Sequence, residues 1–197
     1  IDHPDAICAC VGGGSNAIGI MNAFLDDPRV NLYGFEAGGH GPDSGQHAIR
    51  FAPGTGELGM FQGAKSYLLG NSEGQTLDTY SISAGLDYAS VGPEHAWLKE
   101  IGRVNYSWAT DEEAMNAFKD LCETEGIIPA IESSHAVAGA YKAARDLKEK
   151  GYEHPVMIVN ISGRGDKDMN TAGKWFGYLT DEQAAALEAN GATGNNA

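Results

Sequence analysis

The chain has 197 residues, a length typical of one domain, and 42% of them are hydrophobic, which suffices for a buried core. Its 13 Lys and Arg stand against 27 Asp and Glu, so the formal net charge at pH 7 is −14. Such an acidic surface repels phosphodiester backbones and anionic lipid, which argues against nucleic acid and membrane as partners.

The first predicted elements form one strand–helix–strand unit. Residues Ala6 to Val11 are an apolar run typical of a buried parallel strand. A helix capped by Ser15 or Asn16 is predicted through about Asp27, and a second strand over Val30 to Phe35. Two such strands joined by a helix imply a right-handed crossover.

The next segment is rich in glycine and has little apolar periodicity. Residues 37–63 are too long for a simple connection, which indicates a loop that covers a ligand. A small hairpin is predicted from Ala64 to Leu69 and from Gln75 to Tyr80, with its turn at residues 71–74.

The second half is predicted to continue the alternation of helices and strands. We expect a helix over Pro93 to Ile101, a strand over Val104 to Trp108, and a helix from the capping box at Thr110 to about Glu125. A strand over Ile127 to Ile131 and a helix capped by Ser133 or Ser134 to about Lys150 should follow. The last elements expected are a strand over Pro155 to Ile161 and a short capped helix after Thr180.

These elements predict an α/β fold with a mostly parallel sheet flanked by helices. Residues 1–170 are expected to form one phosphate-binding lobe, and residues 171–197 a tail with a short helix. Four polar segments each follow a predicted strand, and the carboxyl ends of parallel strands meet at one edge of the sheet. We therefore expect a site where these segments converge: Gly12 to Asn16, Glu36 to His40, Glu132 to His135, and Ser162 to Asp168.

The glycine loop that follows the first strand predicts a phosphate site. Consecutive glycines let the backbone approach a ligand, and the N–H groups of the first helical turn then face an anion. The pattern Gly12-x-Gly14-x-x-Ala17, with Glu36 ending the next strand, also fits a dinucleotide loop and hence an NAD-dependent oxidoreductase. The side chains of Ser15 and Asn16 favour a phosphomonoester instead. A non-catalytic phosphate-binding module is a further alternative.

The cysteines are few and unpaired in sequence. Cys8 and Cys10 lie in an apolar run, and Cys122 lies on a predicted helix. We expect buried, reduced thiols and a cytoplasmic protein, with no disulfide framework and no zinc site. The chain also starts at Ile1, immediately before a buried strand, which indicates a piece of a longer polypeptide.

Six motifs together resemble the tryptophan synthase β-subunit family, a group of fold-type-II pyridoxal-phosphate (PLP) enzymes. They occur in the order of that family, at similar spacings, from about Ala6 to Asp168. They span residues Cys10–Gly19, Glu36–Gly41, Tyr80–Tyr88, Ser90–Ala96, Glu125–Ala136 and Ser162–Asp168.

The resemblance implies roles for individual residues. Gly12, Gly13, Gly14, Ser15 and Asn16 would hold the cofactor phosphate, and Ser162 would donate to the pyridine nitrogen. Glu132 would lie beside the ring, and Asp87 would act on the substrate side as a gate. The carbonyl oxygens of Gly12, Tyr88 and Ser90 would bind a monovalent cation, Na+ or K+.

The family's Schiff-base lysine, within a His-Lys-x-Asn segment, is absent from these 197 residues. The chain therefore resembles only the C-terminal portion of the family, and we expect it to be inactive alone. The complete protein would condense L-serine with indole to give L-tryptophan and water. Its implied partners are the missing N-terminal half, a second β chain and the tryptophan synthase α subunit.

Overall fold

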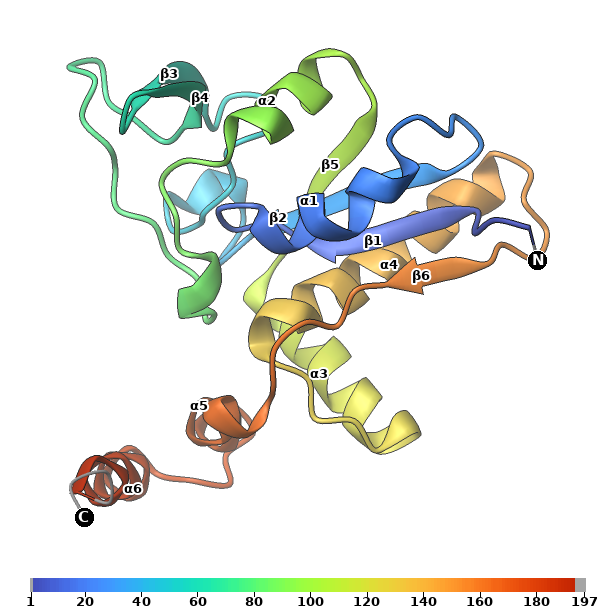
Figure 1. Cartoon of the computed structure of the whole chain (residues 1–197). Helices are drawn as coiled ribbons and strands as arrows, with labels where there is room; N and C mark the ends of the chain where they lie inside the picture. The colour runs from blue at the N-terminus through green and yellow to red at the C-terminus, as the bar shows by residue number, and fades with distance from the viewer. Residues whose placement is uncertain (1, 194–197) are drawn as a thin grey trace.

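A computed structural model describes residues 2–193. Its centre is a four-stranded sheet in the order β5-β2-β1-β6, with all neighbouring strands parallel (Figure 1). The strands are β1 (Ala6–Cys10), β2 (Asn31–Ala37), β5 (Val104–Ala109) and β6 (Met157–Val159). The predicted α/β class is confirmed.

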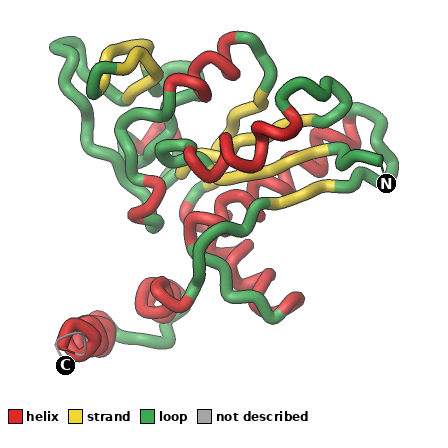
Figure 2. Tube along the Cα trace, viewed as in Figure 1, coloured by secondary structure: helices red, strands yellow, loops and turns green. Residues whose placement is uncertain are grey.

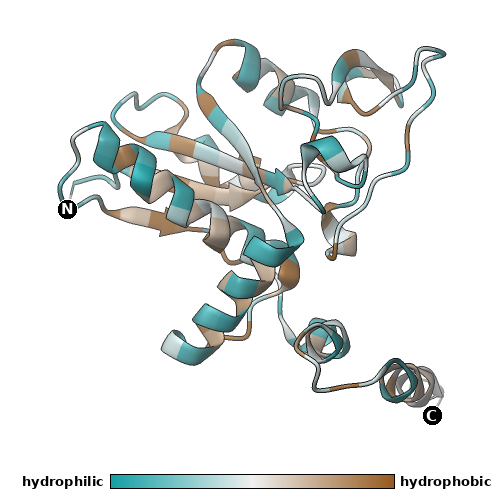
Figure 3. Ribbon diagram, turned by 180° about the vertical axis from the view of Figure 1, so that it is seen from behind, coloured by the Kyte–Doolittle hydropathy of each residue, from teal (hydrophilic) through white to brown (hydrophobic). Residues whose placement is uncertain are grey.

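Helices cover both faces of this sheet, as the continuous burial of β1 requires. On one face, α1 (Ser15–Met21) packs over alternate β1 side chains, among them Ile7 and Ala9, and α2 (Pro93–Glu100) packs beside β5 and joins the same core through Leu98. On the other, α4 (Ile131–Glu149) packs over Ala6 and Cys8. The outer turns of α4 carry hydrophilic residues (Figure 3).

Local sequence rules place several helix ends correctly. Thr110 and Glu113 form a reciprocal capping box at the start of α3 (Asp111–Glu125), and Gly126 ends that helix with φ +67°. Pro93 opens α2 at its first position.

The predicted hairpin is confirmed only in part. Its turn at residues 71–74 forms, closed by a bridge between Gly70 and Thr76 and by the Leu77 N–H donating to the Leu69 carbonyl at 3.0 Å, but residues 75–80 form no strand. The regular ladder instead joins β3 (Glu57–Phe61) to β4 (Ala64–Leu68), through a turn at Gln62-Gly63 with φ values of 48° and 81°. Two consecutive positive φ angles match the twist of a two-residue hairpin.

The predicted strand over Ile127 to Ile131 is also wrong. Residues 126–130 are irregular, and α4 begins at Ile131 with no side-chain cap from Ala130. The predicted caps, Ser133 and Ser134, lie inside the first turn. The carboxylate of Asp168 accepts a hydrogen bond from the Ile131 N–H instead, at 2.9 Å. The first turn of α4 is therefore capped by a residue 37 positions away and not by Ser133 or Ser134.

The C-terminal segment lies away from the sheet (Figure 1). The strand predicted over residues 155–161 is reduced to β6, at the sheet edge. Beyond it, α5 (Met169–Trp175) was not predicted from the sequence, whereas α6 (Asp181–Thr193) follows Thr180 as expected. Residues 194–197, the end of the predicted tail, lie outside the described residues. Among the helices of residues 2–193, none has the length and apolar composition that a bilayer-spanning segment needs.

Candidate functional site

A polar pocket of about 390 Å³ lies at the carboxyl end of β1. Three of the four polar segments predicted to converge there do so. The pocket is lined by Cys10, Gly12, Gly13, Gly14, Ser15, Asn16, Gly85, Leu86, Tyr88, Glu132 and Ser162. All seven residues predicted to bind the cofactor are therefore in one place.

The glycine loop presents unpaired backbone donors to this pocket. Within the described part of the chain, the N–H groups of residues 13–16 make no hydrogen bond. Gly14 caps α1 in the left-handed conformation, at φ +102°, so the expected cap by Ser15 or Asn16 is wrong. A Cβ on Gly14 would lie 2.2 Å from the ring of His95, which requires glycine there.

His95 holds this loop in place through hydrogen bonds of both ring nitrogens. Its Nε2–H donates to the Gly14 carbonyl at 2.8 Å, and its Nδ1 accepts from the Tyr106 hydroxyl at 2.7 Å. Burial lowers the pKa of His95, which keeps the ring neutral and holds this tautomer.

The side chain of Asn16 is turned inward. Its amide donates to the Cys10 carbonyl at 2.7 Å, and its oxygen accepts from Asn160 at 2.7 Å. Asn16 therefore offers the pocket its backbone N–H, not the side-chain donor that the sequence suggested. The exposed Ser15 hydroxyl has no hydrogen-bond partner within residues 2–193.

Glu132 reaches the pocket from the first turn of α4 and is held from two sides. Its carboxylate accepts from the Gly85 N–H at 3.2 Å and from the Lys167 ammonium at 2.9 Å. Burial would raise the pKa of Glu132, but the hydrogen bond and charge of Lys167 outweigh it and hold the pKa below its usual range. A charged carboxylate thus faces the pocket.

Ser162 also lines the pocket, in the segment that follows β6. Its carbonyl accepts a short hydrogen bond from the Ser133 hydroxyl, which ties the segment to α4. The turn that follows contains two ion pairs, Arg164 with Asp166 at 3.3 Å and Lys167 with Asp168 at 2.7 Å. Lys167 also pairs with Glu132, so the segment after β6 is linked to the first turn of α4.

Asp87 does not line the pocket. It follows a short 3-10 turn, Ala84–Leu86, and its Oδ1 is buried without a hydrogen-bond partner in the described structure. Burial raises the pKa of Asp87. Its predicted role on the substrate side stays a prediction.

Glu36 is also absent from the pocket, and this corrects the dinucleotide hypothesis. Its side chain is 1% exposed and accepts from Arg50 Nε at 2.7 Å and from the backbone N–H groups of Arg50 and Phe51 at 3.0 Å. A carboxylate buried in this way cannot receive a ribose hydroxyl.

Arg50, which the sequence did not single out, meets the three carbonyl oxygens predicted to bind a cation. Its guanidinium donates to the carbonyls of Gly12 at 2.7 Å, Tyr88 at 2.5 Å and Ser90 at 3.4 Å. The three oxygens converge as expected, but their acceptor positions are used by a side chain. The expectation of Na+ or K+ at this position is therefore not met by the geometry.

Arg50 belongs to the segment between β2 and α2, which is mostly loop apart from the β3–β4 hairpin (Figure 2). Residues 48–51 are buried within it. Within residues 2–193, no group of three His, Cys, Asp or Glu side chains is arranged to hold a metal ion.

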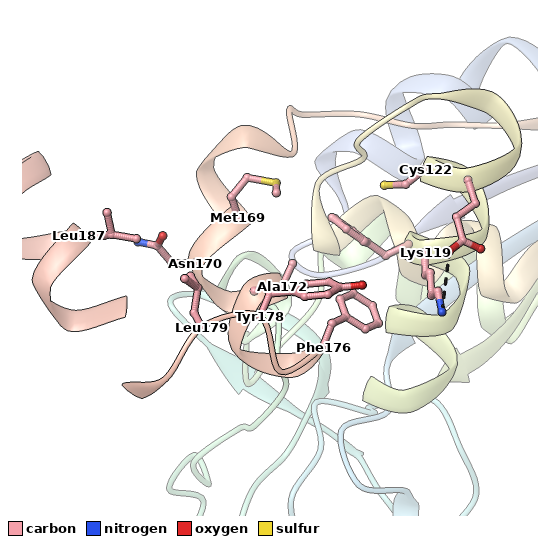
Figure 4. A pocket seen from close by; sticks show the side chains of 12 residues that line it. Lys119, Cys122, Met169, Asn170, Ala172, Phe176, Tyr178, Leu179 and Leu187 are labelled. Carbon is pink, nitrogen blue, oxygen red and sulfur yellow. Dashed lines mark ion pairs between the residues drawn. The ribbon is translucent and has the colours of Figure 1, made fainter. Parts of the chain in front are cut away.

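A second pocket, of about 440 Å³, lies between α3 and the helices α5 and α6 (Figure 4). Its walls are mainly apolar, with Phe118, Met169, Phe176 and Leu187 among the lining residues. Its one charged pair, Lys119 and Glu123, is joined at 3.8 Å. It is larger than the glycine-loop pocket, but it has no converging polar groups.

Comparison with known proteins places these features in a family. A family model described as pyridoxal-phosphate dependent enzyme matches residues 1–161. The tryptophan synthase beta chains of Mycobacterium tuberculosis (strain H37Rv), Mycobacterium leprae and Streptomyces coelicolor are similar to this chain, with 61%, 59% and 54% identity. These matches cover 91%, 89% and 93% of this chain but only 41%, 41% and 42% of those proteins. The chain thus spans about two fifths of the length of these relatives.

A comparison with solved structures supports the fold. The L-serine ammonia-lyase of the fungus Rhizomucor miehei aligns with a TM-score of 0.57 over 87% of this chain and 50% of that chain. The two sequences are 18% identical, so this likeness concerns the fold alone.

Proposed function

This chain belongs to the family of pyridoxal-phosphate dependent enzymes, and on that premise we propose that its glycine-loop pocket binds the PLP phosphate. The observation that supports this most directly is the set of unpaired N–H groups of residues 13–16. A phosphate dianion accepts such donors without any need for net positive charge. The open space above Gly13, where a Cβ would meet nothing within 4 Å, leaves room for it.

The remaining pocket residues suit the other end of the cofactor. When bound, PLP supplies an electron-withdrawing ring that stabilises negative charge on the substrate. We assign the Ser162 hydroxyl to the pyridine nitrogen, since Ser162 lines the same pocket as the glycine loop and the family resemblance gives it this role. A hydroxyl holds that nitrogen without keeping it protonated, so it makes the ring a weaker electron acceptor than a carboxylate would. We propose that Glu132, kept charged by Lys167, lies beside the ring and orients it.

For the complete protein we propose β-replacement on L-serine, with indole as the incoming group and L-tryptophan and water as products. The support is the 61% identity to a tryptophan synthase beta chain and the six motifs that this sequence contains. The cofactor-linking lysine would come from a part of the polypeptide outside these 197 residues. We propose an α subunit and a second β chain as its partners, and the cytoplasm as its location. We also propose that Asp87 acts as a gate on the substrate side of the site.

The phosphate assignment is tested at Gly13 with an isosteric pair. In the intact polypeptide that carries this sequence, Gly13→Asp places a carboxylate beside the phosphate, whereas Gly13→Asn adds the same bulk without charge. Repulsion of about 1–4 kcal/mol between unit charges at ~4 Å predicts a loss of about five- to several-hundred-fold in PLP affinity for Asp relative to Asn. Spectroscopic titration with PLP measures it.

Pyridoxal, which lacks the phosphate, serves as the matched ligand. It should bind the Asp and Asn variants equally. Equal PLP affinity of the two variants would exclude the phosphate assignment. Normal phosphate-dependent binding without tryptophan formation from serine and indole by the intact protein would favour the non-catalytic module instead. The 197-residue chain alone should form no tryptophan, because it lacks the linking lysine.

A further inference from the structure

The guanidinium of Arg50 lies at the centre of a cage of backbone oxygens. It is fully buried, at 0% exposure, and donates to four carbonyls besides the Glu36 carboxylate. Nη2 donates to Gly12 at 2.7 Å and Val11 at 3.1 Å, and Nη1 donates to Tyr88 at 2.5 Å and Ser90 at 3.4 Å. A cluster of carbonyl oxygens with a buried carboxylate attracts a cation, and here the protein provides the cation.

The cage contains all three carbonyls at which the resemblance placed Na+ or K+. An alkali ion must contact these oxygens directly, and their inward sides already accept the guanidinium N–H groups. A second positive charge between them would also be repelled by Arg50. The residues present therefore do not fit a bound monovalent ion.

We propose that Arg50 is a built-in replacement for a monovalent cation, so that the glycine-loop pocket of this protein keeps its shape without any bound alkali ion. A guanidinium is always charged, and its five donors in a fixed plane match several carbonyls at once. Unlike a dissolved ion, it cannot dissociate, so occupancy of the cage does not depend on the salt around the protein.

The position of the cage explains why its occupant affects the pocket. Gly12 and Tyr88 supply oxygens to Arg50 and also line the pocket. Arg50 is thus a positioning residue: it joins the glycine loop to residues 88–90 and touches neither the pocket space nor a bound ligand. Glu36, at the end of β2, fixes the guanidinium from the other side.

A second arginine offers a matched control. Arg103 also donates to four backbone carbonyls, those of Phe24, Leu25, Asp27 and Val30, at 2.6–3.1 Å. Those carbonyls lie around the end of the segment that follows α1, none of them lines the glycine-loop pocket, and no carboxylate pairs with Arg103 in the described structure. Removing Arg103 leaves a similar number of orphaned oxygens without an orphaned buried anion.

The test compares thermal unfolding of the intact polypeptide, without PLP, in choline chloride, NaCl and KCl at equal ionic strength. For the wild type we expect the same Tm in all three salts. Arg50→Met should lower Tm in choline chloride and regain part of the loss specifically in NaCl or KCl, because a small cation can then enter the vacated cage beside Glu36. Arg103→Met should lower Tm equally in all three.

Two further measurements keep the proposal open to refutation if Arg50→Met does not fold. Arg50→Lys retains a positive charge and three donors, so it should fold and show no preference among the three salts. Sodium-23 NMR of the wild type should detect no specific site. Specific stabilisation of the wild type by Na+ or K+, or equal rescue of the Arg50 and Arg103 variants, would overturn the proposal. Because PLP is absent throughout, the result is independent of the phosphate assignment.

Discussion

Two clusters of backbone polar groups lie at the glycine loop, and they differ in whether the described part of the protein supplies their hydrogen-bond partners. The carbonyls of Val11, Gly12, Tyr88 and Ser90 all accept hydrogen bonds from Arg50. The N–H groups of residues 13–16, directly after two of those carbonyls, make none in the described structure. One cluster is completed by the protein, and the other is left for a ligand.

This difference distinguishes polar groups that stabilise the fold from polar groups that are available to bind a ligand. Buried polar groups that are left unpaired cost free energy, so a protein normally satisfies them internally. The carbonyl cage follows that rule and includes a buried arginine to do so. The N–H cluster does not, and it opens into a pocket of about 390 Å³. Unsatisfied donors at an accessible pocket therefore mark the position where an anion completes the structure.

The largest expected effect comes from emptying the cage. Arg50→Met leaves Glu36 buried and unpaired, which should lower the free energy of unfolding by about 3–5 kcal/mol. Glu36→Gln should cost less, about 1.5–3 kcal/mol, because the guanidinium retains its four carbonyl acceptors. Urea denaturation of both variants in choline chloride gives the comparison. A greater loss for Glu36→Gln would mean that the carbonyls contribute little to holding Arg50.

The next effect concerns the shape of the loop that presents the N–H groups. Gly14→Ala adds a Cβ at φ +102° and within 2.2 Å of the His95 ring. The left-handed conformation and the overlap together should cost about 3 kcal/mol. Gly13→Ala is the matched control, since its Cβ would meet nothing within 4 Å. Equal stability of the two alanine variants would show that the loop adapts and that His95 does not fix it.

The two clusters also differ in how far sequence alone could predict them. The position of the loop was predicted because a strand, three glycines and a helix are adjacent along the chain, although its cap and the direction of the Asn16 side chain were not. Ser162 follows a strand of the sheet as predicted, whereas Glu132 reaches the pocket from the first turn of α4 and not from the end of the strand predicted before it. Arg50 could not be foreseen, since its partners Gly12 and Tyr88 are 38 residues away on either side. Nothing local in an irregular, glycine-rich segment indicates that its arginine is buried.

The errors in the fold have the same origin. The cap of α4 is the carboxylate of Asp168, which a local search at Ser133 and Ser134 cannot find. The regular hairpin of β3 and β4 was missed because its Gln62-Gly63 turn carries positive φ at a non-glycine residue, which sequence rules do not favour. The cap of α4 was decided by a contact between residues distant in sequence, which local rules do not include.

A smaller effect is expected from pH. His135 is buried, its Nδ1–H donates to the Ile131 carbonyl at 2.9 Å, and its Nε2 has no partner in the described structure. Burial lowers the pKa of His135 below its ordinary value of 6.5. The unfolded chain therefore takes up a proton first as pH falls below 6.5, and stability is lost until the pH reaches the folded pKa. One such group contributes up to about 1.4 kcal/mol per pH unit.

His135→Asn tests this contribution, since its amide can still donate to Ile131 but does not titrate. The variant should be less stable than the wild type at pH 7.5, yet its stability should fall less steeply between pH 6.5 and 5.5. Chemical denaturation at these pH values measures the slopes. Parallel slopes would assign the acid sensitivity to other groups, such as the buried His95, whose pKa is lowered in the same direction.

The smallest effect should come from a site remote from both clusters, the capping box of α3. The Thr110 hydroxyl accepts from the Glu113 N–H at 3.2 Å, and the Glu113 carboxylate accepts from the Thr110 N–H at 2.9 Å. Thr110→Ala removes the first bond and should lower the free energy of unfolding by about 1 kcal/mol, while Thr110→Ser, which retains the hydroxyl, should be nearly neutral. Neither change touches the pocket, so PLP affinity should equal that of the wild type in both. A drop in PLP affinity with Thr110→Ala alone would show that α3, which packs on α4, helps to hold Glu132 in the pocket. The capping box would then contribute to ligand binding as well as to stability, and the two clusters would not be energetically separate from the rest of the fold.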